Sequence, residues 1–175
     1  MEKYQITGKM SDELIESALM LATLDPIFRA GVGHENIGLV DKDDIKDLKN
    51  IASLVDAKCF TAKHLCLLNP TFGSASTLVG GADADLVIDA NIIDIKTTKN
   101  FDLPRTILDQ VLGYYVLHCI GSVGEIRPKH EITGVGIYYS RHGYLHVVSL
   151  EEFINPKTFP KFLKWFEKRA KQAFG

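Results

Sequence analysis

Two neighbouring apolar runs constrain the fold of this chain more than any other part of the sequence. Residues 78–98 read LVGGADADLVIDANIIDIKTT, and the apolar residues here follow an extended rather than a helical period. Such runs, bounded by turn-forming residues, are typical of β-strands. Asp89 stands between the runs, where aspartate commonly forms a turn. We therefore predict two antiparallel strands, within 78–89 and 91–98, preceded by an extended segment at 64–72.

The pairing of these two strands determines where their charges lie. If Asp89 and Ile92 close a two-residue turn, Asp85 faces Lys96 and Asp94 faces Val87. Because side chains of a strand alternate between its faces, Asp85, Asp94 and Lys96 should share one face. The residues expected to point into the core from the other face are Leu86, Ile88, Ile93 and Ile95.

Two carboxylates beside an ammonium group suggest a metal site. Carboxylates that lie close together repel each other unless a cation sits between them, and hard oxygen ligands suit Mg²⁺ or Mn²⁺. Such a metal can activate water and hold a phosphate oxygen, while a neighbouring lysine orients the water or helps to deprotonate it. The chemistry that this arrangement favours is hydrolysis of a phosphodiester.

These residues resemble a known catalytic signature. Asp85, the following LVI, and then Asp94-Ile95-Lys96 resemble the signature of the PD-(D/E)xK nucleases, and IIDIKTT resembles the motif strand of their RecB-like branch. That branch carries a QxxxY motif on the next helix, which Gln110 and Tyr114 match. Because Asp-x-Lys alone is common, the combination with QxxxY carries the specificity. The resemblance covers about residues 63–150.

The resemblance implies a fold, a metal and roles for these residues. The fold would be the αβββαβ core of restriction-endonuclease-like enzymes, a mixed sheet flanked by helices. Asp85, Asp94 and the backbone carbonyl of Ile95 would hold Mg²⁺ or Mn²⁺, and Lys96 would position or activate water. The QxxxY pair, Gln110 and Tyr114, would orient the water or the substrate phosphate. The family's proline before the first aspartate is absent from this chain.

Each of these residues also has an ordinary interpretation. Asp83 is a minor alternative to the first aspartate of the signature, but a charge at a strand edge explains it as well. Asp94 and Lys96 would form an ion pair on a solvated face if they stood alone. Taken separately, Gln110 and Tyr114 would be a surface amide and a packed aromatic residue. The joint occurrence of the motifs favours catalysis.

RecB-like enzymes often add an upstream histidine or glutamate to the metal site. The candidates here are His34, Glu35 and Glu16, and the sequence does not distinguish between them. Some relatives also carry a four-cysteine iron-sulfur cluster. Three irregularly spaced cysteines cannot supply it, so we expect no such cluster and interpret the cysteines as reduced, mostly buried thiols.

The rest of the chain predicts helices around this core. Ser11 and Asp41 are plausible caps for helices at 12–24 and 43–55, and Asp102 for one at 103–121. A hairpin over 131–150 should turn at His142-Gly143. A last helix at 158–175 should bury Phe162, Phe166, Ala170 and Ala173. The whole is an α/β or α+β layer, which we predict to be one domain over residues 1–175.

The net charge of −2 indicates that any nucleic-acid contact must be local, because domains held to phosphate mainly by charge are usually basic. Lys161, Lys164 and Lys168 form the one concentrated positive face, and Lys99 follows the motif strand. These four lysines are our candidates for binding the nucleic-acid backbone.

The sequence thus predicts a Mg²⁺- or Mn²⁺-dependent nuclease that acts on DNA in repair, recombination, mobile-element biology or defence. The alternative is a catalytically silent subunit of the same fold that binds nucleic acid or a partner protein. A protein partner or a homo-oligomer is possible in either case. The sequence has neither a signal-peptide pattern nor an apolar run of about 18 residues, so we expect a cytoplasmic protein without membrane contact.

Overall fold

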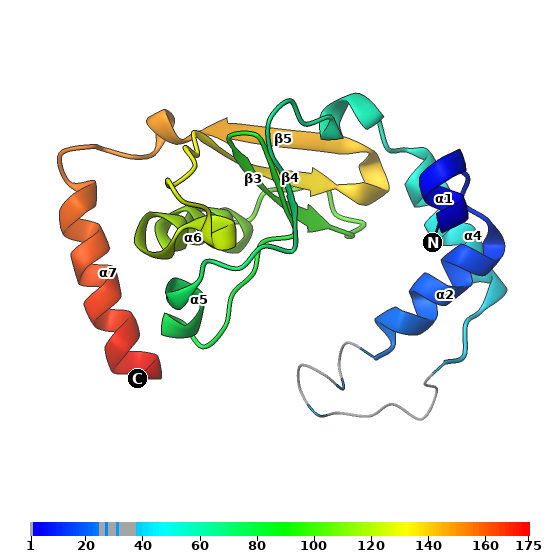
Figure 1. The fold of residues 1–175 in the computed structure, drawn as a ribbon, viewed down its shortest axis with the longest axis horizontal. Coiled ribbons are helices and arrows are strands. Elements are labelled where there is room, and N and C mark those ends of the chain that lie inside the picture. Colours follow the sequence, from blue (N-terminus) through cyan, green and yellow to red (C-terminus); the bar gives the residue numbers. More distant parts are fainter. Residues whose placement is uncertain (1, 25–26, 28–30, 32–37) are drawn as a thin grey trace. The chain divides into compact units, whose positions relative to one another are not determined.

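The computed structural model describes residues 2–24, 27, 31 and 38–175 (Figure 1). The chain divides into two units, Met1–Val55 and Asp56–Gly175. The predicted nuclease-like core, residues 63–150, lies entirely within the second unit. None of the helices in the described part of the chain is long and apolar enough to cross a membrane.

The first unit contains the helices α1 (Glu2–Thr7), α2 (Asp12–Ala22) and α4 (Lys42–Ser53), of which α2 and α4 are in contact. Both predicted caps are confirmed. The Ser11 hydroxyl accepts a hydrogen bond from the Leu14 amide, and the Asp41 carboxylate accepts one from the Asp43 amide. These bonds satisfy amide groups that a helix start leaves unpaired.

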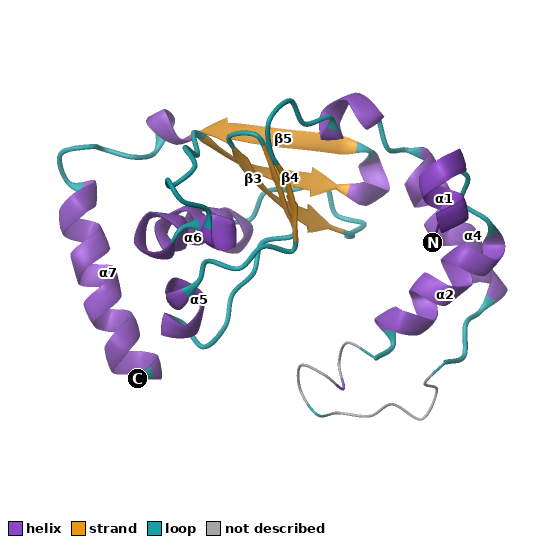
Figure 2. Cartoon of the chain, viewed as in Figure 1, coloured by secondary structure: helices purple, strands orange, loops and turns teal. Residues whose placement is uncertain are grey.

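The second unit is built on a five-stranded mixed sheet (Figure 2). Its strands, in both chain order and sheet order, are β1 (Cys66–Leu68), β2 (Leu86–Ile88), β3 (Asn91–Lys96), β4 (Gly134–Tyr139) and β5 (Tyr144–Ser149). Only β3 and β4 are parallel, and the helix that connects them packs on the sheet. The predicted mixed α/β architecture, a mixed sheet with helices, is confirmed.

The helices of this unit are α5 (Ser74–Leu78), α6 (Arg105–Gly121) and α7 (Phe159–Phe174), and α7 packs against α5 and α6. Single turns of 3-10 helix occur at Ala57–Phe60, Val123–Glu125, Ser140–His142 and Leu150–Glu152.

The two faces of the sheet bury different sets of side chains. Val87 and Ile92 are fully buried in the larger cluster, together with Val111 and Leu117 of α6. The smaller cluster, on alternating positions of the same strands, contains Leu86, Ile88, Ile93 and Tyr138. The main core therefore lies between the sheet and α6.

The predicted pairing of β2 with β3 is wrong by two residues. Ile92 pairs with Val87 rather than with Asp89, so Asp94 does not face Val87 and Asp85 does not face Lys96. The turn is formed by Asp89 and Ala90. A displacement by an even number of residues leaves the faces unchanged, because side chains alternate with a period of two.

Asp89 explains where the turn forms. Its backbone takes a left-handed φ of 49°, which aspartate tolerates better than most residues. Its carboxylate accepts hydrogen bonds of 2.8 to 3.1 Å from the backbone amides of Lys63, His64 and Leu65. These amides lower the pKa of Asp89 to about 2. The turn residue therefore also ties the segment before β1 to the hairpin.

The first predicted strand, 78–89, is shorter than expected. This run contains the end of α5 and then only the three-residue strand β2.

Several burial predictions are wrong. Ile95 is 41% exposed instead of buried, and the smaller cluster contains Ile93 but not Ile95. In α7 Ala170 is buried and Phe166 half-buried, but Phe162 and Ala173 are exposed. Two of the three cysteines, Cys59 and Cys66, are exposed as well.

The start of α6 also differs from its prediction. The residue before the helix is Pro104, which makes no side-chain cap, and Asp102 lies two residues further upstream. The backbone carbonyl of Asp102 accepts a hydrogen bond of 2.6 Å from the Tyr139 hydroxyl. Asp102 thus anchors the β3–α6 connection to β4 rather than capping the helix.

Candidate active site

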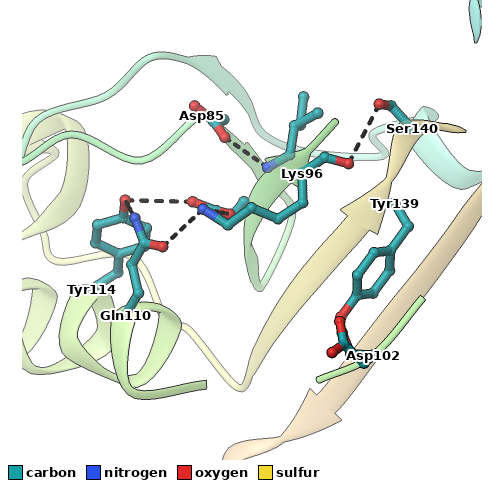
Figure 3. Close-up of polar contacts among 9 residues, drawn as sticks. Asp85, Lys96, Asp102, Gln110, Tyr114, Tyr139 and Ser140 are labelled. Carbon is teal, nitrogen blue, oxygen red and sulfur yellow. Dashed lines mark hydrogen bonds and ion pairs between the residues drawn. The ribbon is translucent and has the colours of Figure 1, made fainter. Parts of the chain in front are cut away.

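Four polar side chains form a closed ring between β3 and α6, here called the polar ring (Figure 3). Lys96 Nζ lies 2.8 Å from Asp94 Oδ2 and donates a hydrogen bond of 2.8 Å to Gln110 Oε1. Gln110 Nε2 donates to the Tyr114 hydroxyl at 2.9 Å. That hydroxyl lies 3.5 Å from Asp94 Oδ1 and closes the ring.

The polar ring follows from the periods of its two elements. In β3, Asp94 and Lys96 are two residues apart and share a face with the fully buried Ile92. In α6, Gln110 and Tyr114 are four residues apart and lie on one side of the helix. Since α6 packs against β3, the structure brings both motifs together.

Asp85 lies next to the polar ring, just before β2. Its Oδ2 accepts a hydrogen bond of 2.6 Å from the Ile95 amide, which comes directly after Asp94 in the strand (Figure 3). Burial raises the pKa of Asp94, and the negative charge of Asp85 adds a smaller contribution in the same direction. The sequence alternative to Asp85, Asp83, forms an isolated β-bridge with Thr71 and is half-buried. Asp85 therefore contacts the motif strand directly.

Asp94 is buried, whereas the ring opens to solvent at Gln110. Asp94 is only 3% exposed, and the Lys96 side chain is 27% exposed. Burial is the largest cause of the raised pKa of Asp94, and the neighbouring Lys96 opposes it. The alternative interpretation, an ion pair on a solvated face, does not describe a carboxylate at this depth.

The Tyr114 hydroxyl stays protonated at neutral pH. Burial, followed by the charge of Asp94, raises its pKa to about 12. Its ring stacks on Phe72, with centroids 5.6 Å apart and planes inclined by 21°. Tyr114 is thus a fixed hydrogen-bond donor beside Asp94.

Sequence reasoning missed three residues that support the site. Phe72, fully buried, packs against Tyr114 from the loop before α5. The Ser140 hydroxyl donates to Thr97 Oγ1 at 2.9 Å and contacts the Lys96 carbonyl at 3.4 Å. Tyr139 holds the β3–α6 connection (Figure 3). These three residues lie outside the sequence motifs, so no motif pattern indicated their contacts.

The oxygen atoms of the site can be compared with the ligands that a divalent cation prefers. Asp85 and Asp94 supply hard oxygen ligands, and Asp94 Oδ2 is buried without a hydrogen-bond donor among the described residues. Lys96 Nζ lies 2.8 Å from this oxygen as its ion-pair partner. The described residues contain no cluster of three or more His, Cys, Asp or Glu side chains that could hold a metal. Mg²⁺ fits, because it commonly takes one or two carboxylates and keeps several waters.

The other candidate residues lie outside the polar ring. Lys99 is exposed in the loop after β3, and Lys161, Lys164 and Lys168 are exposed on α7. Of the proposed upstream ligands, Glu16 is exposed in α2 of the first unit. The other two, His34 and Glu35, lie outside the described residues.

Comparison of the chain with protein-family models, with curated proteins and with solved structures gives no match. A function is therefore inferred from the geometry and chemistry of the site itself.

Proposed function

We propose that this protein is a Mg²⁺- or Mn²⁺-dependent deoxyribonuclease that resembles the RecB-like branch of the PD-(D/E)xK nucleases. The observation that carries the proposal is the polar ring, which unites the Asp-x-Lys strand with the QxxxY helix. The two motifs lie on consecutive elements, and their four side chains contact one another. A buried carboxylate with a shifted pKa in such a cluster also marks candidate functional sites.

Asp85, Asp94 and the Ile95 carbonyl are the groups that would hold the metal. When bound, a divalent cation makes water a better nucleophile and stabilises the charge that develops on a phosphate oxygen. The hydrogen bond from the Ile95 amide holds the Asp85 carboxylate beside the motif strand.

Lys96 is the group suited to act on water. Its ammonium lies between Asp94 and Gln110, and its side chain is partly exposed, so that solvent can approach it. From this position the lysine can orient a water molecule toward a phosphorus atom and stabilise the charge that forms. Gln110 and Tyr114 fix the lysine and Asp94 in place through their hydrogen bonds.

The decisive experiment replaces Asp94 with alanine. Asp94→Ala should abolish Mn²⁺-dependent cleavage of DNA, because a principal ligand is removed, and its circular dichroism spectrum should match that of the wild type. The matched control is Asp102→Asn, which changes an exposed aspartate whose backbone carbonyl, not its side chain, accepts the hydrogen bond from Tyr139. This control should cleave at the wild-type rate.

Cleavage by Asp94→Ala at the wild-type rate would refute the assignment. A wild-type protein that binds DNA but shows no cleavage with Mg²⁺ or Mn²⁺ would instead favour the silent binding subunit of the same fold. Isothermal titration with Mn²⁺ separates these cases further, because the enzyme should bind the ion and Asp94→Ala should not.

A further inference from the structure

Helix α7 concentrates positive charge on a slightly acidic protein. Its sixteen residues contain five Lys or Arg and a single acidic residue, Glu167, whereas the whole chain has a net charge of −2. Glu167 pairs with Lys171 at 2.8 Å. Lys161, Lys164 and Lys168 have no ion-pair partner among the described residues. This helix therefore presents uncompensated positive charge to solvent.

The same helix carries a ladder of aromatic rings that leads from the interior to solvent. Tyr115 of α6 stacks on Phe159, with planes inclined by 14°, and Phe159 stacks on Phe162 at 19°. Phe162 is followed by Trp165, with centroids 5.5 Å apart and planes inclined by 33°. Trp165, the only tryptophan of the chain, is 55% exposed, and Phe162 is 42% exposed. The ladder thus ends at an aromatic ring, that of Trp165, which is exposed to solvent.

A groove lies along this ladder, between α6 and α7. Its volume is about 580 Å³, and α6 contributes Leu112, Gly113 and Val116 to its wall. Concave sites lined by aromatic and apolar side chains are typical of ligand-binding sites. The lining also includes Asp109, but this carboxylate has its own partner, Arg105, at 3.4 Å.

Cationic side chains border the exposed tryptophan. Lys161 precedes Trp165 by four residues, and Lys168 and Arg169 follow it by three and four. On a helix these spacings make neighbours on the same side. A ligand that touches the Trp165 ring is thus within reach of several positive groups. An apolar peptide would not use them, whereas a flexible polyanion with flat rings would use both features.

We propose that this aromatic and basic face of α7 binds single-stranded nucleic acid. Bases would stack on Trp165 and Phe162, and phosphates would contact Lys161, Lys168 and Arg169. The internal bases of a duplex could not stack on the ladder, because they already stack on one another. This inference rests on the proposed action on DNA and narrows the substrate to single strands.

The groove and the polar ring both use residues of helix α6. Helix α6 contributes Leu112, Gly113 and Val116 to the groove and Gln110 and Tyr114 to the polar ring. A strand bound on α7 is therefore held against the helix that also positions the catalytic groups.

The test uses the fluorescence of Trp165 to detect binding. Full-length protein is titrated in EDTA, which prevents cleavage, with an oligothymidylate of about twelve nucleotides and with a blunt duplex of the same length. Stacking should quench the Trp165 fluorescence with the single strand only. Trp165→Ala should weaken binding of a labelled single strand about tenfold and leave duplex binding and the salt slope unchanged.

Two variants separate stacking from a loss of structure. Trp165→Phe keeps an aromatic ring and should restore most of the affinity. Phe174→Ala removes an exposed ring from the same helix, outside the ladder, and should bind like the wild type. Circular dichroism should show unchanged helix content in all three variants.

Three results would overturn the proposal. The first is an unquenched tryptophan together with an unchanged affinity of Trp165→Ala. The second is equal quenching by the duplex. The third is a wild-type dimer that Trp165→Ala converts to a monomer in sedimentation, which would make a second copy of the chain the occupant of the groove. Quenching by the single strand without any cleavage would refute the nuclease but support this binding face.

Discussion

The polar ring and the outer face of α7 use charge in opposite ways. In the ring, the Asp94 carboxylate is buried, and each side chain contacts another member. On α7, Lys161, Lys164 and Lys168 are exposed and have no ion-pair partner among the described residues. Buried charge is costly unless it is paired, whereas exposed charge costs little and acts over a Debye length of about 8 to 10 Å.

This difference indicates which region is suited to catalysis and which is suited to binding. The ring is held in one geometry by its own contacts, as a reaction requires, but it presents little surface to a long polymer. The α7 face offers surface and positive charge but no arrangement of reactive groups. Changes in the ring should therefore alter the rate of cleavage, and changes on α7 should alter affinity and its dependence on salt.

The largest expected effect within this comparison concerns Lys96. Lys96→Ala should lower the turnover number by about a hundredfold or more, since a positioned acid-base group typically contributes about 10² to 10⁴. Mn²⁺ affinity should persist, because lysine is not a ligand. Single-turnover kinetics and calorimetric titration measure the two quantities, with Lys58→Ala, an exposed lysine elsewhere in the chain, as the control. Loss of Mn²⁺ binding would contradict this separation of roles.

A smaller effect is expected on α7. Reversal of Lys161, Lys164 and Lys168 to glutamate should weaken single-strand binding by about tenfold or more at low salt. It should also make the slope of log K against log salt shallower by about 0.7 for each phosphate that the protein no longer neutralises. The free energy of unfolding should change by less than about 0.5 kcal/mol, because these side chains are exposed.

The control for this charge reversal carries Lys42→Glu, Lys46→Glu and Lys58→Glu, which change the net charge equally at other exposed positions. If both triple variants lose affinity to the same extent, net charge rather than the α7 face governs binding. If neither changes the salt slope, the lysines of α7 are only solvated, and the polar ring and its surroundings must hold the substrate.

The smallest effect should be on stability and its dependence on pH. The folded-state pKa of Asp94 is raised above 3.8, so the unfolded chain ionises first as the pH increases. The wild type therefore loses stability across the interval from 3.8 to the folded-state pKa. Asp94→Asn should lack this loss, so its stability relative to the wild type should rise over that interval and then level off.

Urea unfolding from about pH 4 to 8 measures this difference, and Asp102→Asn serves as the exposed control. A variant that becomes steadily less stable than the wild type as the pH rises would show that the ion pair with Lys96 outweighs burial. The burial of Asp94, on which the comparison with α7 depends, would then not be what governs the contribution of Asp94 to the free energy of unfolding.

The sequence predicted those parts of the site that depend on local periodicity. Asp94 and Lys96 share a face because a strand alternates, and Gln110 and Tyr114 share one because a helix repeats about every 3.6 residues. The caps Ser11 and Asp41 are equally local. Each of these features depends on residues within one turn of helix or one strand.

Features set by distant contacts were not predictable in this way. The turn of the hairpin forms at Asp89 because its carboxylate binds amides 24 to 26 residues upstream, which no local pattern encodes. The support of Tyr114 by Phe72 likewise depends on the packing of a separate loop. In α7, periodicity identified an apolar side but not that Phe162 would remain outside the core.

The parallel pairing of β3 with β4 gives the site an order of assembly. All members of the polar ring lie before residue 115, but the strand that pairs with Asp94 begins only at Gly134. Contacts between nearby segments generally form before distant ones. Until β4 docks, the edge of β3 next to Asp94 should stay open to solvent. The site should therefore be complete only once the sheet closes.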